Sequence, residues 1–116
     1  MSYNIKVTHS APTFEQFQEW GIERAFPTFY IDIAFHKDEK EELSFRVKIT
    51  GHYYGSQNFE DIDISLDTYN IHNMSTTQVS ELLDDDNIKN VLEKSIQNSM
   101  IPNDPIGILE TVWDKF

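Results

Sequence analysis

The segment TFYIDIAFHKDEKEELSFRVKI, residues 28–49, decides the fold of this chain. Apolar side chains occupy every second position on both sides of a charged stretch, Lys37 to Glu42. A period of two is typical of strands that bury one face, so the segment predicts two antiparallel strands joined as a hairpin. The predicted buried positions are Phe29, Ile31, Ile33 and Phe35 in the first strand and Leu43, Phe45, Val47 and Ile49 in the second.

A third run with the same period follows the hairpin. Its inward positions are predicted to be Ile62, Ile64 and Leu66, and its outward positions Asp61, Asp63, Ser65 and Asp67. Residues 3–8 alternate in the same way and predict a short fourth strand at an edge of the sheet. Together these runs predict an antiparallel meander.

The rest of the chain carries helix signals. They occur at four places, namely the capping-box pairs Thr13/Gln16 and Ser75/Gln78, the N-cap residue Asp86, and the dipeptide Asp104-Pro105. Because the sheet and each helix have one apolar face, packing them together buries both. The predicted fold is α+β, an antiparallel β-meander of three to four strands with three to four helices packed on one face.

Length and composition predict a folded protein with a single domain, residues 1–116. Hydrophobic residues make up 39% of the chain and aromatic residues 13%, which is too apolar for a disordered acidic tail. The chain has no cysteine, which excludes disulfides and fits a reducing compartment. The sequence has neither a signal-peptide pattern nor the ~20 consecutive apolar residues that a membrane span needs. A cytoplasmic location is expected.

The charge distribution is the clearest indication of function. The formal net charge is −11, and no basic residue lies between Lys48 and Lys89. That interval holds eight acids, which are Glu60, Asp61, Asp63, Asp67, Glu81, Asp84, Asp85 and Asp86. A field of this sign attracts basic partners and repels nucleic acids and anionic membranes. We therefore expect a basic protein as partner and no direct contact with nucleic acid or membrane.

No motif for catalysis, a metal or a cofactor stands out. Asp84, Asp86 and Asn87 match the opening of an EF-hand calcium loop, but Lys89 and Ser95 stand where that loop needs Gly and Glu. The four histidines lack the spacing of a metal site, and no nucleophile elbow or phosphate-binding glycine pattern is present. The sequence predicts a protein that is not an enzyme and needs no cofactor.

One aromatic loop, residues 52–59, joins two predicted strands beside the acidic run. We expect Tyr53 and Phe59 to complete the core and Tyr54 to be exposed. Tyrosine supplies a large contact area at low entropic cost, so an exposed Tyr54 is suited to a protein interface. In that case an aromatic anchor adjoins the acids.

Three readings of the acidic surface remain open. The first is an inhibitor that neutralises a basic partner by occlusion, most simply an immunity protein, or antitoxin, against a nuclease toxin. Its predicted contact residues are Tyr54, Glu60, Asp61, Asp63, Asp67, Glu81, Asp84, Asp85 and Asp86. The second is a nucleic-acid mimic that blocks a defence nuclease. The third is an acidic secretion or folding chaperone, which differs from the others in needing an exposed apolar patch.

Overall fold

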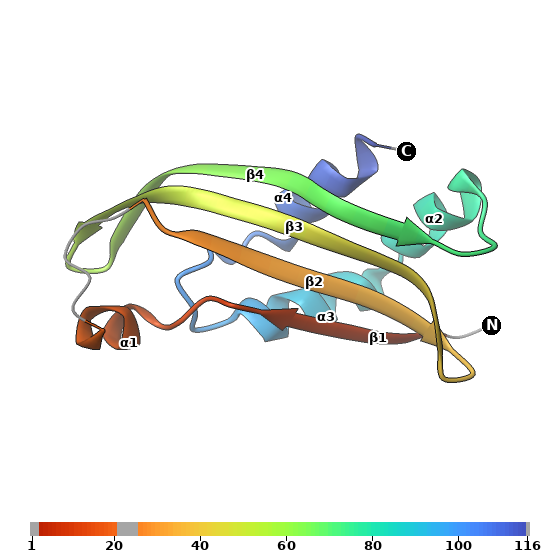
Figure 1. The fold of residues 1–116 in the computed structure, drawn as a ribbon, viewed down its shortest axis with the longest axis horizontal. Helices are drawn as coiled ribbons and strands as arrows, with labels where there is room; N and C mark the ends of the chain where they lie inside the picture. The colour runs from red at the N-terminus through yellow and green to blue at the C-terminus, as the bar shows by residue number, and fades with distance from the viewer. Residues whose placement is uncertain (1–2, 21–25, 116) are drawn as a thin grey trace.

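The alternating segment 28–49 forms the centre of the sheet. The computed structural model describes residues 3–20 and 26–115, and its four antiparallel strands follow one another in chain order (Figure 1). The strands are β1 (Asn4–His9), β2 (Thr28–Lys37), β3 (Lys40–Gly55) and β4 (Asn58–Ile71). The predicted α+β class and the antiparallel meander are confirmed.

The turn between β2 and β3 is shorter than the sequence predicts. Lys37 pairs with Lys40, so Asp38 and Glu39 alone make the connection. Both turn residues have positive φ angles, +52° and +65°, as in the two-residue turns whose twist matches that of antiparallel strands. Sequence reasoning missed this turn because it lacks the glycine that usually marks one.

One face of the sheet is buried as the alternation predicts. Side chains that are fully inaccessible to solvent are Ile31, Ile33 and Phe35 of β2 and Leu43, Val47 and Ile49 of β3. Burying side chains of this size stabilises the fold by about 1.5–3 kcal/mol each. They form one hydrophobic cluster with apolar residues of the helices, including Leu83, Leu92, Ile108 and Val112.

Each predicted start signal lies at the beginning of a helix. The four helices are α1 (Phe14–Glu19), α2 (Thr76–Leu83), α3 (Asp86–Ile96) and α4 (Pro105–Trp113). Both capping boxes are formed, at the start of α1 and of α2, and Asp104 caps α4 ahead of its first-turn proline. For α3 the N-cap is Asp85, one residue before the predicted Asp86, because the Asp85 carboxylate accepts the Asn87 N–H at 3.0 Å.

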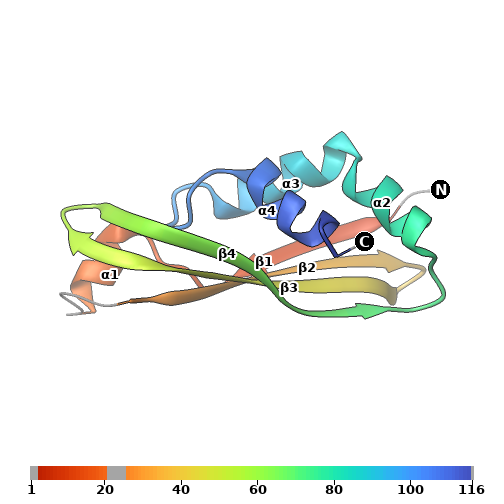
Figure 2. The same cartoon turned by 90° about the horizontal axis from the view of Figure 1, so that it is seen from above.

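The helices lie unevenly along the sheet. Figure 2 shows α2, α3 and α4 on the same side of the sheet, whereas α1 lies at the end where β3 turns into β4. Two hydrogen bonds attach α3 to β1: the His9 ring Nε2 donates to the Ser95 carbonyl at 2.8 Å, and the Ser95 hydroxyl donates to the Val7 carbonyl at 3.3 Å. The fold is elongated, with a longest dimension of 45 Å.

Candidate partner-binding site

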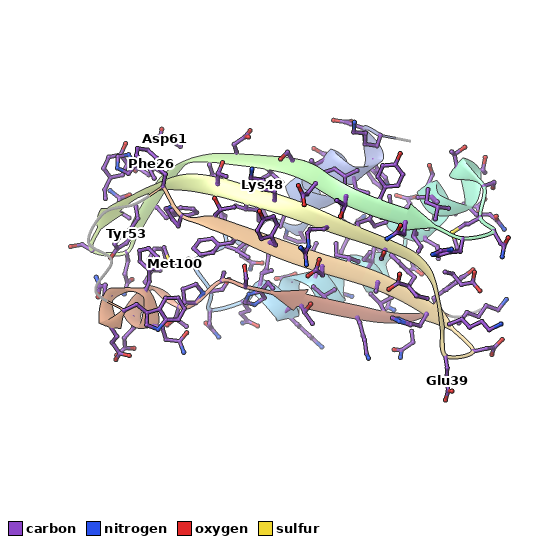
Figure 3. All side chains as sticks on the ribbon, viewed as in Figure 1. Phe26, Glu39, Lys48, Tyr53, Asp61 and Met100 are labelled. Atoms are coloured by element: carbon purple, nitrogen blue, oxygen red, sulfur yellow. The ribbon has the colours of Figure 1, made fainter. Side chains whose placement is uncertain are left out.

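One end of the molecule gathers most of the exposed aromatic groups. We call it the hairpin end, and it consists of α1, the first residues described before β2, the β3–β4 turn and the segment between α3 and α4. Figure 3 shows Phe26, Tyr53, Asp61 and Met100 here, while Glu39 lies at the opposite end. The elements that build this end come from four separate parts of the sequence.

Buried aromatic rings form the interior of the hairpin end. Tyr53 is 2% exposed, its ring meets the edge of the Phe17 ring at 4.8 Å between centroids, and its hydroxyl accepts a hydrogen bond from Gln18 Nε2 at 3.0 Å. Phe59 pairs with Tyr53 across the strands and is 9% exposed. The predicted burial of Tyr53 and Phe59 is confirmed.

Three neighbouring rings, tilted against one another, lie on the other face of the sheet at this end. His52 lies 3.8 Å from Tyr54 and 4.5 Å from Phe26, measured between ring centroids. Tyr54 is 52% exposed, as predicted, and Phe26 is 71% exposed. We call these three rings the aromatic patch. Trp20, which caps the end of α1, is also 62% exposed.

Asp61 is hydrogen-bonded to the aromatic patch. The Tyr54 hydroxyl donates a hydrogen bond to its carboxylate at 2.8 Å. This bond raises the pKa of Tyr54 above its ordinary value, with smaller contributions from partial burial and from the charges of Asp61 and Glu60. An aromatic side chain and a carboxylate are therefore held together at the surface, in the combination that the sequence predicts.

The acids of β4 do not form the regular row that the alternation predicts. On β3, His52 pairs with Glu60 and Thr50 pairs with Asp63. Two residues of β4, Asp61 and Ile62, therefore lie opposite the single residue Gly51 of β3. Asp61 adopts a left-handed conformation, with φ of +56°, and Ile62 is 37% exposed although it lies on the helix side of the strand with Phe59. This is a β-bulge, which bends its strand and changes which side chains point outward.

A second irregularity follows at Asp67. Val47 pairs with Leu66 but Arg46 pairs with Thr68, so Asp67 has no partner of its own on β3. The physical reason for both irregularities is the spacing of apolar residues in β4. Phe59 and Ile71 have odd numbers and Ile64 has an even number. Their side chains therefore reach the same buried face only if the alternation along β4 shifts by one residue at two places.

The remaining predicted contact acids lie at the other end. Glu81 belongs to α2, and Asp84, Asp85 and Asp86 join α2 to α3. Figures 1 and 2 both show α2 at the opposite end of the sheet from the β3–β4 turn. Asp85 is occupied as a helix cap, and Asp86 lies 3.7 Å from Lys89. Glu81 and Asp84–Asp86 therefore lie apart from Glu60 and Asp61, and Asp67 lies part-way along β4, so the hairpin end does not gather all eight acids.

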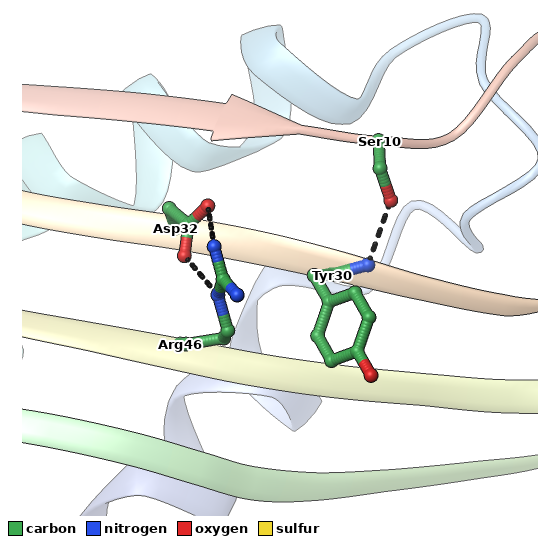
Figure 4. Close-up of polar contacts among 4 residues, drawn as sticks. All are labelled: Ser10, Tyr30, Asp32 and Arg46. Atoms are coloured by element: carbon green, nitrogen blue, oxygen red, sulfur yellow. Dashed lines mark hydrogen bonds and ion pairs between the residues drawn. The ribbon is translucent and has the colours of Figure 1, made fainter.

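Arg46 is paired with Asp32 and also interacts with one acid of β4, Asp67. Its guanidinium donates two hydrogen bonds to Asp32 of β2, at 2.8 and 3.2 Å (Figure 4). The guanidinium carbon also lies 5.2 Å from the centre of the Tyr30 ring. The backbone N–H of Tyr30 donates a hydrogen bond to the Ser10 hydroxyl. The hydrogen bond to Asp32 and the charge of Asp32 raise the pKa of Arg46, and the charge of Asp67 on β4 adds to this shift, so Arg46 offsets part of the acidic charge of β4.

A cleft opens on the helix side of the hairpin end. Its volume is about 610 Å³, and it lies between the start of β4 and the segment that joins α3 to α4. Apolar side chains that line it are Phe14, Phe59, Ile62, Ile96, Met100 and Ile101. Sequence reasoning missed this cleft because its two walls are about forty residues apart in the chain.

Within residues 3–20 and 26–115, no group of three or more His, Asp or Glu side chains is placed to hold a metal ion. No helix in the same ranges has the length and apolar character of a membrane span. Comparisons with protein-family models, curated proteins and solved structures gave no significant match.

Proposed function

We propose that this protein is a chaperone that binds non-native polypeptide segments at its hairpin end. The observation that carries the proposal is the exposure of three large aromatic side chains there, Trp20, Phe26 and Tyr54. Exposed apolar patches of this kind on small soluble proteins mark interaction sites. Tyrosine and tryptophan are also the residues that contribute most at protein interfaces.

The charge of the hairpin end supports a basic client. Its described segments, residues 11–20, 26–29, 49–64 and 96–104, contain no Lys or Arg. They contain the acids Glu15, Glu19, Glu60, Asp61, Asp63 and Asp104. Carboxylates around an apolar surface favour segments that combine apolar and basic residues, and they speed association at low salt.

The second candidate is an acidic inhibitor of a folded basic protein, such as an immunity protein against a nuclease toxin. The bond between Tyr54 and Asp61 favours it, because an aromatic anchor beside carboxylates suits a specific interface. It ranks second because Glu81 belongs to α2, which lies at the opposite end of the sheet from Tyr54 and Asp61. The bulges at Asp61 and Asp67 also make the spacing of the β4 carboxylates irregular, unlike the even phosphate spacing of ~3.4 Å. This irregularity argues against the third candidate function, a nucleic-acid mimic. For all these roles we place the protein in the cytoplasm.

An aggregation assay tests the proposal. We expect the wild-type protein to suppress light scattering by a basic protein unfolded by reduction of its disulfides. Phe26→Ser combined with Tyr54→Ser is expected to require about thirtyfold more protein for the same effect, since each of the two rings contributes on the order of 1 kcal/mol. The matched control is Ile106→Ser, which removes an equally exposed side chain from the first turn of α4.

Two results would count against the chaperone. Scattering that wild type does not reduce contradicts it directly. Tight, stoichiometric binding to one folded basic protein, without any effect on unfolded ones, supports the inhibitor instead.

A further inference from the structure

The cleft beside β4 has two features that suit an extended peptide backbone. One is its apolar floor, of which Met100 and Ile101 are each 2% exposed while Ile62 is open to solvent. The other is its rim, where five carboxamide side chains are exposed. These are Gln57, Asn58, Gln97, Asn98 and Asn103.

The rim carboxamides are free to bind a ligand. In the part of the chain that the structure describes, none of their side chains makes a hydrogen bond to another residue. Each carboxamide offers an acceptor oxygen and two donor hydrogens, which is the complement of a peptide group. A polypeptide that enters the cleft therefore meets partners for its own N–H and C=O groups, which lowers the cost of removing them from water.

The backbone of β4 supplies a further set of partners. β4 is the outermost strand of the sheet, and among the described residues no element besides β3 forms a backbone hydrogen bond to its 58–64 portion. An exposed strand edge can pair with an extended peptide, which then places alternate side chains toward and away from the floor. The bulge at Asp61 limits this pairing to a few residues on either side of it.

The charge of the cleft restricts which peptide fits. Among the described residues that line the cleft, Glu60 is the one that carries a charge, and Asp61 and Asp63 follow on the same strand. A peptide side chain that points away from the floor, along β4, thus meets carboxylates. This favours Lys or Arg at positions that alternate with apolar residues.

The geometry points to this cleft as the site for an extended client segment in which apolar and basic residues alternate. The inference rests on the proposed chaperone function and names its client class and its binding site. The segment adds to the edge of β4, its apolar side chains contact Ile62 and Met100, and the rim carboxamides hold its backbone. The aromatic patch on the other face of the sheet is then a separate contact for the same client.

Two positive-φ positions allow a sharp test of the rim. Gln57 has φ of +64° and Asn98 of +67°, a conformation that glycine adopts without steric cost. Gln57→Gly combined with Asn98→Gly therefore removes two carboxamides without straining the backbone. Glu39→Gly is the matched control, because Glu39 has φ of +65° and lies at the opposite end of the molecule.

The measurement is fluorescence anisotropy with a short labelled peptide in which Leu alternates with Lys. We expect the Gln57→Gly/Asn98→Gly variant to bind it about three- to tenfold more weakly than wild type and Glu39→Gly to bind it unchanged. Glu60→Lys is expected to weaken binding by a similar factor and to reduce its salt dependence. A peptide with Glu in place of Lys, or with N-methylated backbone amides at alternate residues, is expected to bind more weakly to wild type.

The outcomes separate the site from the function. If the protein suppresses aggregation but the rim and Glu60 variants bind the peptide like wild type, the cleft assignment is wrong and the chaperone proposal stands. If wild type neither suppresses aggregation nor binds the peptide, both fail. Equal affinity for the Leu/Lys and Leu/Glu peptides would refute the basic client class.

Discussion

Gly51 and Phe59 provide the most direct check on how the hairpin end is built. Gly51 lies on β3 opposite the bulge, and the Phe59 ring packs over it. A Cβ atom added at Gly51 would lie 2.6 Å from Cζ and 2.7 Å from Cε1 of that ring, and 3.0 Å from the Glu60 carbonyl oxygen. Real Cβ atoms do not approach so closely, so Gly51→Ala must displace the Phe59 ring, which forms part of the cleft floor.

The magnitude follows from the packing. Overpacking a close-packed interior by one methyl group costs about 1–3 kcal/mol. Phe59→Ala removes the ring and costs about 3 kcal/mol, at the low end for phenylalanine because Phe59 is 9% exposed. In the double variant the ring is absent and the new methyl group enters the space it leaves. We therefore expect the double variant to be about as stable as Phe59→Ala alone, a coupling of about 1–3 kcal/mol.

The assay is urea denaturation followed by the fluorescence of Trp20 and Trp113, with Thr50→Ala as a control for the outward-facing neighbour on β3. That control is expected to change the free energy of unfolding by less than about 0.5 kcal/mol. If the two single variants add in the double variant to within about 0.5 kcal/mol, Gly51 does not support the Phe59 ring and this account of the cleft floor is wrong.

Three further predictions concern caps, turns and titration. Ser75→Ala removes the side chain that accepts the Gln78 N–H at the start of α2, so it is expected to lower the free energy of unfolding by about 1 kcal/mol in urea; no change would contradict the capping role. Glu39→Gly is expected to raise the free energy of unfolding by a few tenths to about 1 kcal/mol, because glycine adopts the φ of +65° at no steric cost. A destabilised variant would contradict the two-residue turn between β2 and β3. Tyr54 is expected to titrate above 10.0 in an absorbance titration and to move toward that value in Asp61→Gly, which removes the carboxylate and tolerates the positive φ. Because its pKa is raised on folding, the stability from this pair is present below pH ~10 and is lost as pH rises through the folded value; loss of that stability between pH 6 and 8 would contradict the assignment.

Local signals in the sequence predicted local structure well. The alternation in residues 28–49 identified the buried positions, because a residue two places along a strand points to the same side whatever the rest of the chain does. The pairs Thr13/Gln16 and Ser75/Gln78 marked two helix starts for the same reason, since a capping box is complete within four residues.

Features that depend on distant residues were not predicted. Phe26 meets His52 only because β2 and β3 are paired, and no local pattern in the sequence indicates that contact. A single acidic contact surface would require the acids of residues 81–86 to lie near those at the start of β4, but the chain leaves β4 at the end opposite the β3–β4 turn, and α2 begins there. The bulges did leave a signal: apolar residues in β4 change from odd numbers at Phe59 to even numbers at Ile64, and back to odd at Ile71.

The central claim is that the hairpin end recognises non-native polypeptide and not positive charge alone. The most direct measurement compares the affinities for one basic protein in two states, native and reduced with its cysteines blocked by an uncharged reagent, so that sequence and charge are the same. We predict that the reduced form binds at least about tenfold more tightly, and that Phe26→Ser with Tyr54→Ser removes most of this difference. Equal or tighter binding of the native form, unaffected by these substitutions, would contradict the account and favour an acidic inhibitor of a folded partner.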